Sequence, residues 1–127
     1  MTTTIPDTRT IDAVIFDPVL DPVLNNGRLT ARLLEANGIH VIPVYTLEEL
    51  RRAAAKLEGS VVYITDPSTG SGFDSGALTV LHEAKVPDDK VLLMIASYSP
   101  EMAAYDTISK PCKQDDLMKK IKELQQR

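Results

Sequence analysis

YDTISKP, residues 105–111, is the stretch that decides the fold of this chain of 127 residues. It is a short strand-like run that ends in Lys110, and an amphipathic pattern over residues 113–125 follows it. The apolar positions of that pattern recur at helical spacing: Leu117, Ile121 and Leu124. The end of the chain therefore predicts a strand, a lysine at the strand's carboxyl end, and a closing helix that packs through one face.

Three further apolar runs upstream have the length and composition of strands. Residues 13–16, 61–65 and 91–96 are nearly continuous apolar runs, which is typical of strands buried on both faces. The residues that come directly after the four runs are Asp17, Asp66, Ser97 and Lys110. If the strands are parallel, their carboxyl ends lie along one edge of the sheet, and these four polar side chains gather there.

The composition excludes several classes of function. A formal net charge of −4 disfavours a phosphate backbone as partner, and 5% aromatic residues with no Trp leave little for base stacking. The single cysteine, Cys112, excludes an internal disulfide and a cysteine-based metal site. No apolar run approaches the ~20 residues of a membrane span. Residues 1–10 lack a hydrophobic signal core, so we expect a cytoplasmic protein that binds neither nucleic acid nor membrane, with a flexible tail at residues 1–10 and one domain at residues 11–127.

Helical patterns alternate with the strand-like runs. We expect helices over residues 28–36, 47–57 and 75–84, the second of them opened by a capping box of Thr46 and Glu49. The inner faces that the spacing predicts are Leu29, Leu33 and Leu34 in the first helix, and Ala77, Val80, Leu81 and Ala84 in the third. Strands that alternate with helices favour a parallel sheet with helices on both faces.

Pro43 helps to order the sheet. It lies inside the second strand, residues 39–45, just after Gly38 stops the first helix. Proline donates no backbone hydrogen bond, so this strand is expected at an edge. With five strands, the simplest arrangement is the flavodoxin-like, doubly wound α/β fold with strand order 2-1-3-4-5. Strands one and three are then neighbours where the winding reverses, which is where open α/β sheets bind ligands.

The connection between the fourth and fifth strands is short. Residues 98–104 supply seven residues, whereas a parallel crossover with its helix usually takes at least ~10–12. Fully extended they reach ~23 Å, so we expect a mostly extended connection with at most one turn, begun by Ser99-Pro100-Glu101. The fourth helix of the fold is lost or vestigial. An antiparallel fifth strand stays open as an alternative, and it would move Lys110 to the opposite edge.

From residue 11 to residue 124 this pattern resembles the receiver domain of two-component response regulators. The most specific part is AYDTISKP, residues 104–111, followed by Asp115-Asp116-Leu117 at the start of the last helix. The resemblance implies that Asp66 accepts a phosphoryl group from a histidine kinase or a phosphotransfer protein. Catalysis in such a module is limited to its own phosphorylation and autodephosphorylation, so we do not expect an enzyme that turns over an external substrate.

The resemblance also implies roles for the other strand-end residues. Asp17 would hold Mg²⁺ together with Asp66, Ser97 would bind a phosphoryl oxygen, and Lys110 would pair with the phosphoryl group. This chemistry is sensible in itself, because a carboxylate that attacks a phosphoryl donor needs its charge neutralised by an oxygen-bound cation. A lysine and a hydroxyl then cover the remaining oxygens.

The chain departs from the receiver pattern at several positions. Receivers carry two adjacent acids after the first strand, whereas here Pro18 follows Asp17, which leaves Asp21 as the candidate for the missing carboxylate. Thr107 occupies the position of the aromatic residue that switches in active receivers, and Tyr105, two residues earlier, should point to the same face. The small residues 68–72 after Pro67 predict a mobile loop, with a backbone phosphate cradle as a second interpretation.

Two other functions compete with the phosphorylated switch. A pseudo-receiver would keep the fold as a protein-interaction module without phosphotransfer, which the missing acid, the missing switch aromatic and the lost helix favour. A haloacid-dehalogenase-like phosphatase is the third hypothesis, because residues 14–17, VIFD, resemble the first motif of that family. That chemistry needs a second aspartate at position 19, where this chain has Val.

Overall fold

The computed structural model describes most of the chain. The described residues are 11–16, 26–57, 60–69, 72–73, 76–95, 98–109 and 113–126. The predicted tail at residues 1–10 lies outside them. No helix within these ranges combines the length and the apolar character needed to cross a membrane.

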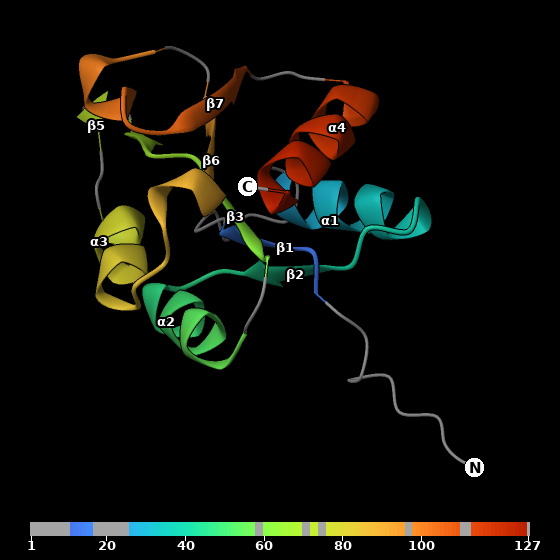
Figure 1. The fold of residues 1–127 in the computed structure, drawn as a ribbon, viewed down its shortest axis with the longest axis horizontal. Helices are drawn as coiled ribbons and strands as arrows, with labels where there is room; N and C mark the ends of the chain where they lie inside the picture. The colour runs from blue at the N-terminus through green and yellow to red at the C-terminus, as the bar shows by residue number, and fades with distance from the viewer. Residues whose placement is uncertain are drawn as a thin grey trace.

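A five-stranded sheet runs through the middle of the molecule (Figure 1). Its strands, in sheet order, are β2 (Val41–Val44), β1 (Ala13–Phe16), β3 (Val62–Thr65), β6 (Val91–Ile95) and β7 (Asp106–Ser109). Every neighbouring pair is parallel. The predicted flavodoxin-like order is confirmed, and β2, which contains Pro43, is an edge strand as expected.

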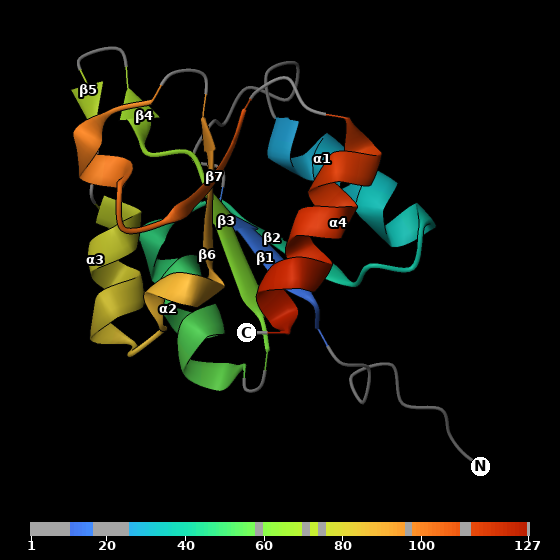
Figure 2. The same ribbon diagram turned by 45° about the horizontal axis from the view of Figure 1, so that its top comes forward.

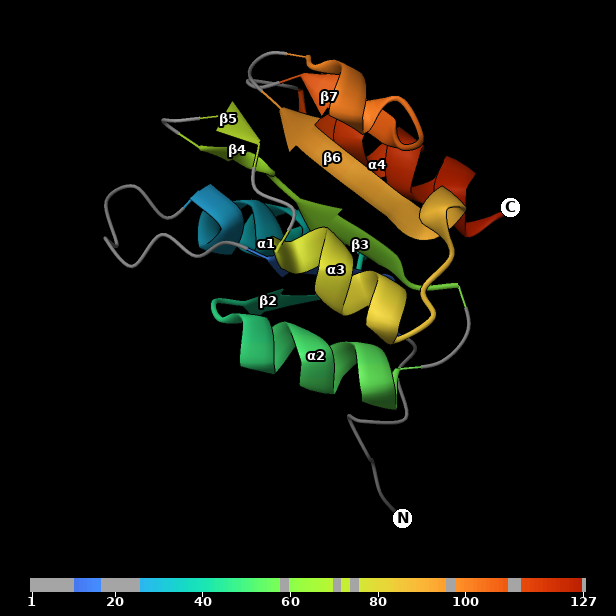
Figure 3. The same ribbon diagram turned by 90° about the vertical axis from the view of Figure 1, so that its left-hand side faces the viewer.

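Helices cover both faces of the sheet, as the alternation of strands and helices predicts. α1 (Asn26–Ala36) and α4 (Gln114–Gln125) lie side by side on one face (Figures 1 and 2). α2 (Leu47–Lys56) and α3 (Gly76–Glu83) lie together on the other face (Figure 3). The sheet is therefore the middle layer of three, and its central strands are covered on both faces.

Alternate strand residues divide between two hydrophobic cores. Val14, Tyr63 and Leu93 belong to the core under α2 and α3. Their chain neighbours Ile64 and Leu92 belong to the core under α1 and α4. The predicted inward residues of the helices are buried in these cores: Ala77, Val80, Leu81, Leu117, Ile121 and Leu124, with Ala84 partly buried. All four residues of β3 are buried, which explains why its sequence is a continuous apolar run.

The predicted inner face of α1 is wrong at Leu33. Ala31 and Leu34 are buried, at 4% and 0% exposure, whereas Leu33 is 45% exposed. Successive helical residues are turned by about 100°, and with Leu34 directed at the sheet, Leu33 lies at the margin of the helix and does not point at the sheet. Ala31 and Leu34, three residues apart, form the stripe that does. The side chain of Leu29 lies outside the described part of the chain.

Local signals at the helix ends are confirmed. The Glu49 backbone N–H donates to Thr46 Oγ1 at 3.0 Å, and Glu49 Oε1 accepts from the Tyr45 N–H at 3.1 Å. In the usual capping box the glutamate accepts from the backbone N–H of the cap residue, which here is Thr46. In this chain Glu49 accepts instead from the N–H of the residue before the cap, Tyr45. Gly38, just after α1, has φ +86°, the left-handed conformation that glycine adopts without strain.

The connection between β6 and β7 has the predicted form. Its described part, residues 98–105, contains a single 3₁₀ turn, η3 (Pro100–Met102), in place of an α-helix. β7 nevertheless pairs in parallel with β6, with Leu93 opposite Thr107, so the antiparallel alternative is wrong. Met102 is only 2% exposed and belongs to the core under α2 and α3. One buried side chain takes the place of a helical face.

The stretch after Asp66 differs from the predicted mobile loop. Ser68–Thr69 (β4) and Gly72–Phe73 (β5) pair as a short antiparallel hairpin. A two-residue Gly-Ser link between extended segments is a hairpin signal. The correction therefore has a sequence basis, although strands of two residues are too short for an apolar pattern to reveal them.

Candidate functional site

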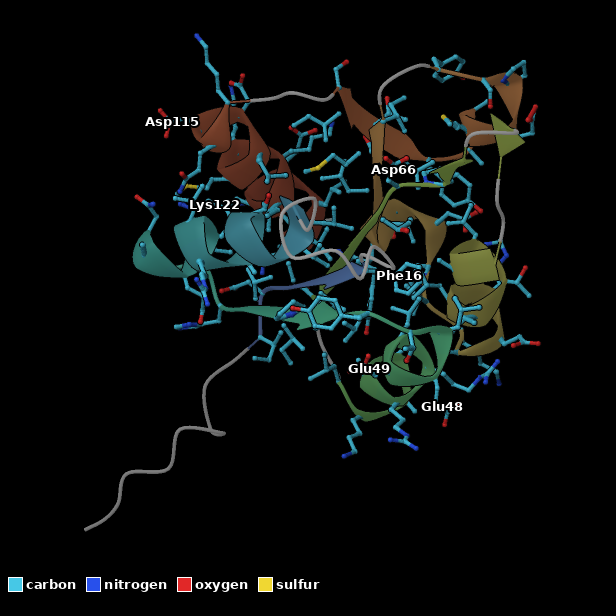
Figure 4. All side chains as sticks on the ribbon, turned by 180° about the vertical axis from the view of Figure 1, so that it is seen from behind. Phe16, Glu48, Glu49, Asp66, Asp115 and Lys122 are labelled. Atoms are coloured by element: carbon cyan, nitrogen blue, oxygen red, sulfur yellow. The ribbon has the colours of Figure 1, made fainter. Side chains whose placement is uncertain are left out.

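The carboxyl ends of the strands meet at one edge of the sheet. Phe16, the last residue of β1, is paired with Thr65, the last residue of β3. Ile95 and Ser109, the last residues of β6 and β7, are paired with each other. In Figure 4 Asp66 lies just beyond β3 and Phe16 at the end of β1. The four runs that carry the predicted site residues therefore end along a single edge.

Asp66 is the predicted site residue that the structure describes. It directly follows β3, the middle strand of the sheet, and is partly buried between buried Thr65 and buried Pro67. A partly buried carboxylate needs polar partners or a cation, because losing water costs free energy for a charged group. Its place at the carboxyl end of a central parallel strand is where open α/β sheets put their ligands.

The other predicted site residues lie outside the described residues: Asp17, Asp21, Ser97 and Lys110. Three of them lie within two residues, along the sequence, of a described strand end. Asp17 follows Phe16, Ser97 comes two residues after Ile95, and Lys110 follows Ser109. Their roles, and the phosphatase hypothesis that depends on positions 17 and 19, stay predictions.

The side chains available at this edge can be compared with the ligands that the expected cation, Mg²⁺, prefers. Within the described ranges, no group of three or more His, Cys, Asp or Glu side chains converges in a way that would hold a metal ion. Asp66 supplies carboxylate oxygens, and the two acids predicted to join it, Asp17 and Asp21, lie outside those ranges. A set of three carboxylates fits Mg²⁺, which prefers oxygen ligands, and does not suit a soft metal.

Tyr105 points to the face that the sequence predicts for it. Its ring packs against the core under α2 and α3, whereas Ile108 packs against the core under α1 and α4. By alternation along β7, Thr107 shares the face of Tyr105. Burial raises the pKa of the Tyr105 hydroxyl, and the negative charge of Asp88 raises it further. Tyr105 therefore keeps its proton at neutral pH.

Polar contacts at the opposite, amino-terminal edge were not predicted. Lys90 is 8% exposed, and its Nζ donates to the Leu124 carbonyl at 2.7 Å, at the end of α4. Asp12 accepts from the His40 backbone N–H at 2.8 Å and from Gln125 Nε2 at 2.9 Å. These contacts join residues far apart in the chain and follow no periodic pattern, so no local sequence signal indicates them.

Comparison with known proteins places the fold. No protein-family model and no curated protein matches the chain. Among solved structures, the receiver domain of the Francisella response regulator 1452 matches with TM-score 0.67 and 18% identity, over 91% of this chain and 96% of that one. A response regulator receiver protein from Sinorhizobium medicae WSM419 matches with TM-score 0.66 and 15% identity, over 94% and 97%. The corresponding values for a CheY-like receiver domain protein from Methanospirillum hungatei JF-1 are 0.61 and 14%, over 90% and 93%.

The chain has the fold of a response regulator receiver domain. The matching structures are only 14–18% identical to this chain in sequence. They therefore show that the arrangement of strands and helices is shared, and they do not assign roles to individual site residues. Asp66 lies at the switch-point edge of that fold, and the 3₁₀ turn η3 stands where a crossover helix would lie.

Proposed function

We propose that this chain is a receiver module of a two-component signalling system, which accepts a phosphoryl group on Asp66 from a histidine kinase or phosphotransfer protein. The position of Asp66 carries the proposal. It is a partly buried carboxylate at the carboxyl end of the middle strand of a receiver fold. The pairing of Phe16 with Thr65 supports a second carboxylate, Asp17, beside it.

In the proposed reaction a carboxylate oxygen of Asp66 attacks the phosphorus of a phosphohistidine. The new Asp66 O–P bond forms as the P–N bond breaks, and the leaving imidazole keeps the electron pair. Asp66, Asp17 and Asp21 would hold Mg²⁺, which would supply positive charge opposite the transferring group. Ser97 would donate a hydrogen bond to one phosphoryl oxygen, and Lys110 would pair with another.

The experiment adds Mg²⁺ and beryllofluoride, a mimic of the phosphoryl group, and follows backbone amide shifts by NMR. The proposal expects shifts centred on residues 65–67 and on the segment after Ser109, and their loss in Asp66→Asn. Asp115→Asn is the matched control, because it removes an equivalent charge from the exposed first turn of α4, away from the strand end (Figure 4). An unchanged spectrum with the fold intact would contradict phosphorylation of Asp66.

The alternative is a pseudo-receiver that binds a partner protein without phosphotransfer. The hairpin of β4 and β5 favours it, because paired strands begin two residues after Asp66. The change of an acid to Pro18 in the sequence points the same way. An intact fold that ignores Mg²⁺ and beryllofluoride is the result this alternative predicts. Turnover of a generic phosphate ester that is lost in Asp17→Asn would instead support the phosphatase hypothesis.

A further inference from the structure

Three side chains from separate elements meet on the face of the sheet that α2 and α3 cover. His82 comes from α3, Asp88 from η2 (Asp88–Lys90), and Tyr105 from the connection into β7. His82 Nε2 lies 2.8 Å from Asp88 Oδ1 and 3.2 Å from the Tyr105 hydroxyl oxygen. The imidazole and phenol rings are also stacked, with centroids 6.3 Å apart and planes at 24°.

Both polar contacts use the same ring nitrogen. This excludes a relay of the kind in which a histidine links a carboxylate on one nitrogen to a hydroxyl on the other. It also makes the two contacts compete. An ionised carboxylate only accepts hydrogen bonds, so the contact to Asp88 requires a proton on Nε2. The Tyr105 hydroxyl can donate to Nε2 only when that nitrogen has no proton.

We propose that His82 is a proton-controlled latch, whose Nε2 holds η2 through Asp88 when it carries a proton and the β6–β7 connection through Tyr105 when it does not. Because Tyr105 stays protonated at neutral pH, it is available as the donor in the second state. The 2.8 Å contact to Asp88 corresponds to the first state. Acid adds a second proton to an imidazole ring, which leaves only the first state.

The latch acts on a connection with little else to hold it. The eight residues 98–105 contain one 3₁₀ turn and bury Met102, and Tyr105 is the last residue before β7. The Tyr105 backbone N–H donates to the Met102 carbonyl at 3.0 Å. Gain or loss of the side-chain hydrogen bond at His82 therefore changes how firmly the entry to β7 is fixed.

The charged residue nearest to His82 along the chain is Lys85, which is exposed and whose backbone N–H donates to the His82 carbonyl at 3.0 Å. On α3, the Glu83 carboxylate lies 3.6 Å from Arg51 of α2. On η2, Asp89 is exposed, and the Lys90 ammonium is directed to the end of α4. On η3, the Glu101 carboxylate lies 3.4 Å from the Ser99 hydroxyl. Asp88 is therefore the one carboxylate that contacts His82 among the described residues.

The test is the tautomer of His82, read from its two ring ¹⁵N shifts by long-range ¹H–¹⁵N correlation in the full chain. In the unaltered protein Nε2 should be protonated in all molecules in acid, and at neutral pH part of the population should carry the ring proton on Nδ1 instead, which frees Nε2 to accept from Tyr105. In Asp88→Ala the competing acceptor is gone, so at neutral pH Nε2 should become unprotonated and accept from Tyr105. The double variant Asp88→Ala with Tyr105→Phe keeps the ring stack, lacks the donor, and should lose that preference.

Amide hydrogen exchange measures how firmly the entry to β7 is fixed. In Asp88→Ala the Tyr105 amide should exchange about two- to tenfold more slowly at neutral pH than in the double variant, the size expected for one net hydrogen bond. The difference should vanish in acid. His40, the other of the two histidines, is an internal control for the fold, and its shifts should not move. The same His82 tautomer in the single and double variants, with unchanged His40 signals, would overturn the latch. None of these readouts depends on phosphorylation of Asp66.

Discussion

The two faces of the sheet differ in the contacts that hold their covering elements in place. On one face, α4 is held by its buried stripe and by polar contacts to separate elements: Lys90 to Leu124, Gln125 to Asp12, Lys120 to Asp106, and Gln114 to Leu33. On the other face, the last part of the sheet is covered by a 3₁₀ turn, one buried methionine and the stacked Tyr105.

This difference shows how a shortened receiver fold can stay folded. The shortened crossover still contributes one buried side chain, Met102, to the core under α2 and α3. It does not keep a helix's internal hydrogen bonds or its length. The face of α1 and α4 should therefore fix the global stability, whereas the η3 region should open locally at lower free energy.

The largest effect should come from the α4 face. Ile121 is fully buried in the core under α1 and α4, so Ile121→Ala leaves a cavity in a rigid surrounding and should lower the free energy of unfolding by about 3–5 kcal/mol. Urea denaturation measures it. Lys119→Ala, exposed on the same helix, is the control and should change stability by less than about 0.5 kcal/mol.

Met102→Ala should cost less, about 2–3 kcal/mol. Met102 is nearly as buried as Ile121, at 2% exposure, but it lies in a short connection that can move to close the cavity. Native-state hydrogen exchange should show faster opening of residues 103–109 than of α4. Equal acceleration of both segments would mean that the two faces form one cooperative unit, against the comparison drawn here.

Lys90→Met tests the polar contacts that hold the end of α4. The substitution keeps an apolar stem in the buried position and removes the donor to the Leu124 carbonyl. We expect a loss of about 1–2 kcal/mol, since a hydrogen bond from a charged group is lost at a helix C-terminus. Thermal unfolding with amide shifts measures it, and changes confined to residues 88–95 with no shift in α4 would contradict the assignment.

Tyr63→Phe should have the smallest effect, visible only in alkali. Burial raises the pKa of Tyr63 above its usual 10.0, so the unfolded chain loses this proton first. Stability is then fully present below about pH 10 and falls as the pH rises through the raised pKa of the folded state. Tyr105 acts in the same direction. Urea unfolding at about pH 8 and pH 11 should show a smaller fall for Tyr63→Phe than for the parent; an equal fall would assign the effect elsewhere.

Much of this fold could be predicted because its signals are local. The apolar runs, the Thr46 capping box, Gly38 and the edge position of Pro43 each act within a few residues, and the length of the stretch 98–104 alone excluded a fourth crossover helix. Leu33 was mispredicted because helical spacing gives a stripe but not the angle at which it meets the sheet. The Lys90 and Asp12 contacts depend on residues 34 and 113 positions away, and only the folded chain brings them together.

The sequence predicted which edge of the sheet carries the candidate site, but not how the side chains of the site are arranged. Strand ends and register bring β1 and β3 together, which the alternation of strands and helices implies. Asp66 lies where that reasoning put it. The roles of Asp17, Asp21, Ser97 and Lys110 depend on the paths of loops that contain proline or follow strand ends, and loop paths have no periodic signal.

The most direct test is phosphorylation itself. The chain is incubated with Mg²⁺ and a small-molecule phosphoryl donor, and intact mass and peptide mapping locate any phosphoryl group that hydroxylamine removes, as expected for an acyl phosphate. The account predicts one phosphoryl group per chain, on Asp66, absent in Asp66→Asn and retained in Asp115→Asn. A phosphoryl group on another residue, or none on a correctly folded chain, would contradict it.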